Sequence, residues 1–137
     1  MNIAAISEMF ATANLNKLQF GRTMNRFEPK RQRNLGINDG IKGVYFIFKH
    51  GDKTSPYYIG ETGRCIKQRI SNHKKSLNNP DWKVEITGSK FINAGIDIDQ
   101  EFDIWYIDAK DIECKTKKEL IAAETLFMTY FQPKIWN

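Results

Sequence analysis

The 137-residue sequence predicts an α/β (α+β) protein, in which a small three-stranded antiparallel sheet is flanked by helices and preceded by a basic helical N-terminal extension. Two short runs with alternating side chains are separated by turn-forming residues, as in a β-hairpin. Later segments carry apolar residues at helical spacing. With 41% hydrophobic residues, the chain is long enough to fold around one modest core. We therefore expect an extension over residues 1–42 and one domain over residues 43–137.

Three segments are predicted to be strands. Residues 44–49 are rich in β-branched and aromatic residues that alternate with period two, which is typical of a strand. Turn-forming residues follow, and residues 57–59 are predicted to pair with the first strand as an antiparallel hairpin. Gly60 and Gly63 should then lead the chain into a helix. The third strand is predicted over residues 101–109, where apolar and polar side chains alternate.

Two helices are predicted after the hairpin. Residues 65–77 have a stripe of apolar residues at helical spacing. Arg69 and His73 are four residues apart, so they should share one side of this helix, next to the stripe and facing the edge of the sheet. A second, short helix is expected from Ser89, as its N-cap, to Gly95, as its stop.

The last predicted helix begins with a capping box. Thr116 and Glu119 fit the S/T-x-x-E pattern, so the helix should start directly after Thr116 and run to about Phe131. Glu124 falls in the middle of its apolar face. A carboxylate there is costly unless its charge is compensated. A metal ion would compensate it, and so would a structural salt bridge to Arg69 or a lysine.

Four of these residues together indicate a phosphate site. Tyr45 and Tyr58 lie on adjacent predicted strands, and Arg69 and His73 come from the next helix. Arginine offers a planar fork of donors to a phosphodiester, and a tyrosine or histidine can position or deprotonate a water. Each residue alone is more often structural than catalytic, so the prediction depends on their combination.

The motifs Gly43-Val44-Tyr45 and Tyr58-Ile59-Gly60, followed by Arg69 and His73, resemble the GIY-YIG nuclease family. The resemblance covers about residues 43–137. In this family a small sheet presents two tyrosines and the next helix presents an arginine. A glutamate on a later helix is the single protein ligand of a divalent metal, and an asparagine usually lies near the end of the module.

The resemblance implies hydrolysis of phosphodiester bonds in double-stranded DNA with Mg²⁺ or Mn²⁺. The implied catalytic residues are Tyr45, Tyr58, Arg69, His73, Glu124 and Asn137. Glu124 would bind the metal and Asn137 would brace the site. Which tyrosine acts on the water stays open, and Arg64 is an alternative to Arg69 as the phosphate ligand.

Charge is distributed unevenly along the chain, whose net charge is +5. Residues 1–42 carry seven Lys or Arg and three acids, and a second basic cluster follows the hairpin. Such clusters favour phosphate backbones. The expected DNA contacts are Arg22, Arg26, Lys30, Arg31, Arg33, Arg64, Lys67, Lys74 and Lys75. The basic arm of the extension, residues 21–34, would bind phosphates alone or also read base edges. The acidic run at 97–113 is expected to be solvated surface.

The expected function is that of a compact, site-specific endonuclease of restriction-like, phage or mobile-element type. The alternatives are a structure-selective repair or recombination nuclease, and a catalytically silent DNA-binding module on the same fold. Because each active site would offer one metal and one water, cutting both strands would require two protomers or two successive binding events. A homodimer is therefore one arrangement to test. The amphipathic segment 3–13 would pack on the domain or form the dimer contact.

The expected location is the cytoplasm of a bacterial or phage-infected cell. No run of residues has the length and apolar character of a membrane span, and no signal-peptide pattern is present. Cys65 and Cys114 lack metal-ligand spacing, so we expect reduced thiols.

Overall fold

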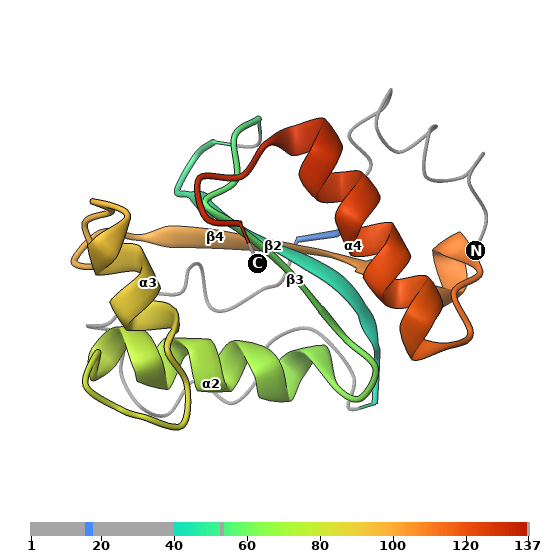
Figure 1. Cartoon of the computed structure of the whole chain (residues 1–137), viewed down its shortest axis with the longest axis horizontal. Helices are drawn as coiled ribbons and strands as arrows, with labels where there is room; N and C mark the ends of the chain where they lie inside the picture. Colours follow the sequence, from blue (N-terminus) through green and yellow to red (C-terminus); the bar gives the residue numbers. More distant parts are fainter. Residues whose placement is uncertain (1–15, 18–39, 53, 137) are drawn as a thin grey trace.

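The computed structural model describes residues 16–17, 40–52 and 54–136. This part of the chain is a mixed α+β structure, in which a sheet lies between two layers of helices (Figure 1). The predicted helix at 3–13, the basic arm and Asn137 lie outside the described residues. Among the described helices, none combines the length and the apolar character needed to cross a membrane.

The three predicted strands form the antiparallel sheet, and a two-residue strand extends it. The strands are β1 (Asn16–Lys17), β2 (Gly43–Lys49), β3 (Tyr58–Thr62) and β4 (Phe102–Asp108). Their order is β1-β4-β2-β3, and each neighbouring pair is antiparallel. Strand β2 is therefore central, whereas β3 forms one edge of the sheet.

Strand β3 is longer than predicted, because it continues through Gly60 to Thr62. Gly60 pairs with Tyr45, and Thr62 pairs with Gly43. The expectation that Gly60 ends the strand is wrong. Pairing along the whole of β2 outweighs the weak strand preference of glycine, which also marks positions where another group approaches the backbone closely.

Helices cover both faces of the sheet. They are α2 (Ile66–Asn78), α3 (Thr87–Asn93), the short 3-10 helix η1 (Ala109–Ile112) and α4 (Lys117–Phe131). Helices α2 and α3 pack on one face and α4 packs on the other (Figure 1). The capping box of α4 is confirmed, because the Thr116 hydroxyl accepts the N–H of Glu119 at 3.2 Å.

Helix α3 begins three residues earlier than predicted, and Ser89 lies inside it rather than at its N-cap. Its first turn is instead satisfied by a neighbouring helix. The Ser76 hydroxyl of α2 accepts the N–H of Gly88 at 2.8 Å and donates to the carbonyl of Glu85 at 2.8 Å. A side chain distant in sequence therefore replaces the local cap that Ser89 was expected to provide.

Two hydrophobic cores lie on opposite faces of the sheet, as the alternation in β2 predicts. On the α2 side the core includes Tyr45, Ile47 and the apolar stripe of α2. On the α4 side it includes Phe46 and Phe127, whose rings meet edge to face with centroids 5.4 Å apart. In this way β2 supplies alternate side chains to both cores.

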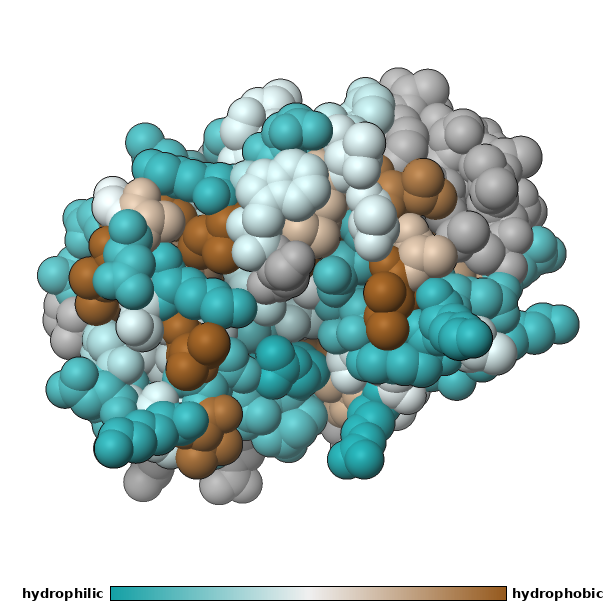
Figure 2. Space-filling view, in the orientation of Figure 1, coloured by the Kyte–Doolittle hydropathy of each residue, from teal (hydrophilic) through white to brown (hydrophobic). Residues whose placement is uncertain are grey.

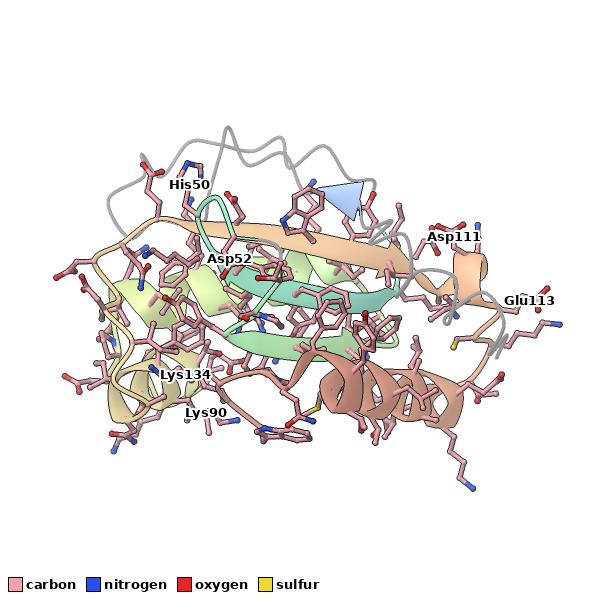
Figure 3. The ribbon with its side chains drawn as sticks, turned by 90° about the horizontal axis from the view of Figure 1, so that it is seen from above. His50, Asp52, Lys90, Asp111, Glu113 and Lys134 are labelled. Carbon is pink, nitrogen blue, oxygen red and sulfur yellow. The ribbon has the colours of Figure 1, made fainter. Side chains whose placement is uncertain are left out.

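Asp103 contradicts the expectation that the acidic run is solvated surface, because it is 2% exposed. Its carboxylate accepts hydrogen bonds from His50 Nδ1 and from the backbone N–H of Gly51, both at 2.9 Å. His50 lies at the turn that follows β2 (Figure 3). Asp103 therefore closes the end of the β2–β4 pair, which is a structural role that its charged neighbours in sequence conceal.

Exposed apolar side chains are scattered over the described surface. The larger ones are Val84, Ile86, Ile92, Ile121, Leu126, Tyr130 and Trp136. On the face shown in Figure 2, apolar residues are separated by hydrophilic ones and form no continuous patch. Single exposed apolar residues of this kind are normal on a protein surface.

Candidate active site

Tyr45 and His73 form a buried pair between the sheet and α2. Tyr45 is 1% exposed and His73 is fully buried. The Tyr45 hydroxyl lies 2.7 Å from Nε2 of His73. Tyr58 lies beside both, with its ring centroid 6.2 Å from that of Tyr45 and 5.2 Å from that of His73. The structure therefore brings together both predicted tyrosines and the predicted histidine.

The second nitrogen of His73 connects this pair to a carboxylate. His73 Nδ1 is hydrogen-bonded to the Thr87 hydroxyl, and that hydroxyl donates to Oε1 of Glu85 at 2.8 Å. Because the single hydroxyl proton of Thr87 goes to Glu85, Thr87 accepts from Nδ1–H of His73. Nε2 is then the acceptor for the Tyr45 hydroxyl. The chain of donation runs from Tyr45 through His73 and Thr87 to Glu85.

Arg69 binds the same carboxylate. Its Nη1 lies 2.7 Å from Oε2 of Glu85, and a third of its side chain is exposed. The positive charge of Arg69 also lies near enough to the Tyr45 hydroxyl to lower its pKa. A guanidinium with one nitrogen on Glu85 has further N–H donors for an incoming anion. The structure thus places Arg69 at the solvent side of the buried pair.

Burial controls the protonation of this cluster. Burial, together with the positive charge of Arg69, lowers the pKa of His73 to about 3. Burial also raises the pKa of Tyr45 well above its usual value, Tyr58 raises it further, and Arg69 opposes both. At neutral pH the pair is therefore a neutral phenol and a neutral imidazole.

Glu85 keeps its negative charge despite partial burial. Burial alone would raise its pKa, but the Thr87 hydrogen bond and the neighbouring His73 and Arg69 hold the pKa below its usual value. Sequence reasoning missed both Glu85 and Thr87. The local sequence offers one weak signal for Glu85, which is that it is the single acid between Asp81 and Asp97. Its role is visible only once α2 and the loop before α3 are packed together.

Glu124 lies on the opposite side of the sheet from Tyr45 and His73. It is half-buried on α4, and the nearby backbone N–H of Glu61 acts to lower its pKa. Burial and the adjacent Glu61 carboxylate raise the pKa of Glu124 to about 7, and Lys117 opposes the shift. Lys117 Nζ lies 2.7 Å from both carboxylate oxygens of Glu61. The lysine that would compensate Glu124 in a simple salt bridge thus pairs with Glu61, and Arg69 pairs with Glu85.

Edge strand β3 separates the two halves of the site. Gly60 faces Tyr45 on the α2 side, and the next residue, Glu61, faces α4 because successive side chains of a strand point to opposite faces. The predicted residues therefore lie on both faces of the sheet, with Gly60 and Glu61 of the edge strand between them.

The acidic side of this edge fits a hard divalent cation. Mg²⁺ is commonly bound by one or two carboxylates and several waters, and Glu124 with the adjacent Glu61 offers such oxygen donors. In the described part of the chain, no group of three or more His, Cys, Asp or Glu is placed to hold a metal. A cation held by these two carboxylates would take its remaining ligands from water.

The predicted DNA contacts are described only in part. Arg64 and Lys75 are exposed, and Lys67 and Lys74 are half-buried. The predicted contacts in the N-terminal arm lie outside the described residues; they are Arg22, Arg26, Lys30, Arg31 and Arg33. Cys65 and Cys114 are free thiols, as expected.

No family model matches the chain, and neither a curated protein nor a solved structure matches it. The resemblance of the two tyrosine motifs therefore stays a prediction from sequence. At the β3 edge the structure places a tyrosine–histidine pair and an arginine on the α2 side, and a half-buried glutamate on the α4 side.

Proposed function

We propose that the protein is a divalent-metal-dependent endonuclease of the GIY-YIG type that hydrolyses phosphodiester bonds of double-stranded DNA. The observation that carries the proposal is the hydrogen bond between the Tyr45 hydroxyl and the buried, neutral His73, next to the charged Arg69. A phenol with a raised pKa stays protonated at neutral pH, so it can accept a proton only if it gives up its own. It becomes effective when a neighbouring group accepts its proton in the same step.

The proposed reaction moves one proton through this pair. A water attacks phosphorus, its proton passes to the Tyr45 oxygen, and the phenolic proton of Tyr45 passes to Nε2 of His73. The bond from phosphorus to the leaving oxygen breaks, and that oxygen is protonated by solvent. The imidazolium formed on His73 is short-lived, because burial lowers the pKa of His73 to about 3, and Glu85 stabilises it through the Thr87 hydroxyl. Among the two tyrosines, we assign this step to Tyr45.

Arg69 would orient the phosphate. Its nitrogens that do not bind Glu85 can donate to the non-bridging oxygens of the scissile group. A divalent cation held by Glu124, beside Glu61, would supply neutralisation of charge on the leaving oxygen. Tyr58 would pack against Tyr45 and His73 and hold their rings in position.

The first test is cleavage of supercoiled plasmid with Mg²⁺ by the wild type, by Glu124→Ala and by the control Asp81→Ala, which removes an exposed acid. We expect nicked and linear products with wild type and Asp81→Ala. We expect none with Glu124→Ala or with EDTA, while DNA affinity in a gel shift stays within a few-fold. Unchanged cleavage by Glu124→Ala would refute the metal assignment.

The same assay separates the alternative functions. Discrete limit bands after exhaustive digestion would support the proposed site-specific enzyme. Preferential cutting of branched DNA over plasmid would support a structure-selective nuclease. Binding of DNA without cleavage of any substrate would contradict the nuclease and favour a DNA-binding module.

A further inference from the structure

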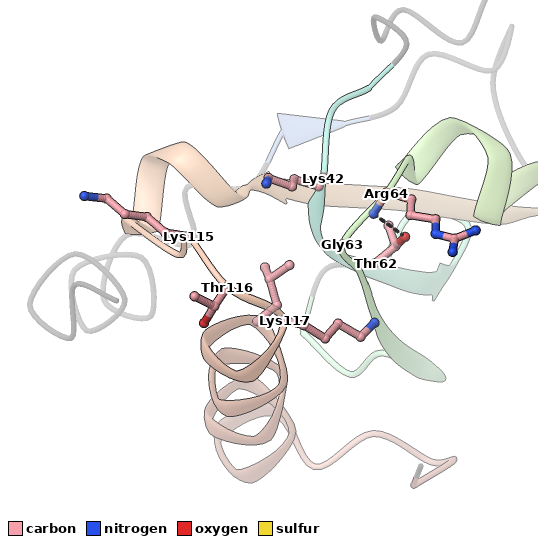
Figure 4. A pocket seen from close by; sticks show the side chains of 8 residues that line it. Lys42, Thr62, Gly63, Arg64, Lys115, Thr116 and Lys117 are labelled. Atoms are coloured by element: carbon pink, nitrogen blue, oxygen red, sulfur yellow. Dashed lines mark hydrogen bonds between the residues drawn. The ribbon is translucent and has the colours of Figure 1, made fainter.

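A basic pocket lies beside the β3 edge, apart from the Tyr45–His73 pair. It has a volume of about 400 Å³, and the residues that matter here are Lys42, Thr62, Arg64, Lys115, Thr116 and Lys117. They come from three segments: the residue before β2, the end of β3 with the turn after it, and the start of α4. Figure 4 shows these side chains, with Thr62 at the end of β3 and Arg64 in the turn that follows.

Four cations line this pocket, and all are exposed. In Figure 4 the side chains of Lys115 and Arg64 extend in opposite directions. Lys117 forms an ion pair with Glu61 at 2.7 Å. Within the described ranges, no ion pair is recorded for the side chains of Lys42, Arg64 or Lys115. Like charges brought together from three segments repel one another unless an anion shares the site. The charge balance thus points to a negatively charged ligand.

Thr62 adds a polar group that is held in place. It is only 5% exposed, and its hydroxyl oxygen accepts the backbone N–H of Arg64 at 3.2 Å. An acceptor for the hydroxyl's own proton is not recorded among the described residues, so that proton is available to a ligand in the pocket. A buried hydroxyl donor, a guanidinium and several ammonium groups are the donors that bind phosphate oxygens.

The position of the pocket along β3 indicates which phosphate of a bound strand it would contact. Thr62 is two residues beyond Gly60 along the edge strand, a distance of roughly 7 Å at the usual rise of a strand. Lys117 connects the pocket to Glu61, which lies beside Glu124. An extended polyanion at the β3 edge would therefore pass from the candidate active site into this pocket.

We propose that this pocket binds a backbone phosphate of the DNA strand, next to the phosphate that is cleaved, and so positions the strand along β3. This inference rests on the proposed DNA cleavage for the identity of the ligand. Lys42, Lys115 and Lys117 were not among the DNA contacts predicted from sequence, whereas Arg64 was. Free phosphate shares the same chemistry, so the test must distinguish the two sources.

The test compares two charge-matched double variants of the full chain. Lys42→Gln with Arg64→Gln removes two cations from the pocket, and Lys118→Gln with Lys134→Gln removes two exposed lysines outside it (Figure 3 shows Lys134). Affinity for a short DNA duplex is measured by fluorescence anisotropy in Ca²⁺ at several salt concentrations. We expect the pocket variant to bind about 10-fold more weakly and to have a salt dependence smaller by about one counterion.

The outcomes separate the pocket from the nuclease. Equal affinity and equal salt dependence of the two double variants would overturn the pocket, even if the wild type cuts DNA. A selective loss of duplex affinity would support the pocket, even if the wild type cuts nothing and the proposed function fails. In an NMR titration, shifts of the Thr62 and Gly63 amides with inorganic phosphate but not with duplex would also overturn the proposal, since they would assign the pocket to free phosphate.

Discussion

The phenol of Tyr45 lies against the backbone of Gly60, its partner in the β2–β3 pair. A Cβ atom at position 60 would overlap the Tyr45 hydroxyl group. The hydroxyl reaches Nε2 of His73 from this position. Gly60 therefore provides the space that the tyrosine–histidine pair needs, which explains a glycine inside an edge strand.

Gly60→Ala should displace Tyr45 from His73. We expect the free energy of unfolding to fall by about 1–3 kcal/mol, as in other overpacked sites, and DNA cleavage to fall at least about 10-fold. Gly63→Ala is the matched control for unfolding, because the nearest atom to its Cβ would be Cδ of Lys117 at 3.5 Å, an ordinary contact. Equal urea midpoints for the two variants would show that Tyr45 does not occupy this space.

Tyr45→Phe removes the hydroxyl and keeps the ring in the core. We expect single-turnover cleavage to fall by about 10²–10⁴-fold, the usual range for loss of a proton-transfer group. Tyr58→Phe should cost less, and the exposed Tyr130→Phe should cost nothing. A larger loss in Tyr58→Phe than in Tyr45→Phe would reassign the proton transfer to Tyr58.

Glu85→Gln tests the carboxylate that sequence reasoning missed. Thr87 and Arg69 donate to different oxygens of Glu85, so the NH₂ group of a glutamine would face one of these donors. We expect the free energy of unfolding to fall by about 1–3 kcal/mol and cleavage to fall about 10-fold, because His73 loses the support of its charge. Asp81→Asn, in the same loop, is the control in urea unfolding. If Glu85→Gln unfolds and cleaves DNA like the wild type, Glu85 has no role in the site.

Local patterns predicted those parts of the fold that local chemistry determines. The Thr116–Glu119 capping box located α4, and the alternation in residues 44–49 located β2 and its two faces. The same reasoning placed Glu124 on an apolar face, and the structure shows it half-buried there. In each case, neighbours in sequence supply the decisive interaction.

Features that depend on distant partners were predicted wrongly or missed. Gly60 continues β3 because it pairs with β2, and α3 begins early because Ser76 of α2 caps it. Asp103 is buried because His50 and Gly51 bind its carboxylate. No spacing in the sequence marks such contacts, and the role of Glu85 is hidden for the same reason.

Glu124→Gln should stabilise the metal-free protein at alkaline pH. The pKa of Glu124 is raised to about 7 in the folded state, so the native carboxylate is disfavoured once the pH exceeds its ordinary value of 4.5. The stability that Glu124 contributes is therefore fully present below pH 4.5 and is lost as the pH rises through 7. At pH 8 in EDTA we expect a gain of about 1–2 kcal/mol, after allowing for solvent screening. Urea unfolding at pH 8 and pH 4 measures it, and an equal effect at both would contradict the shift.

His73 should make the fold sensitive to acid. Burial lowers the pKa of His73 to about 3 in the native state, whereas in the unfolded chain it is about 6.5. Between these pH values the unfolded chain binds a proton at His73 and the native state does not. The stability that neutral His73 contributes is present above pH 6.5 and is lost as the pH falls toward 3. Between pH 6 and 4 its contribution to the free energy of unfolding should fall by about 1.4 kcal/mol per pH unit. In urea unfolding at several pH values, His73→Gln should remove this slope. His50→Gln, which changes the other histidine, should keep it. Equal slopes in the two variants would mean that His73 titrates normally and is not buried beside Tyr45 in solution.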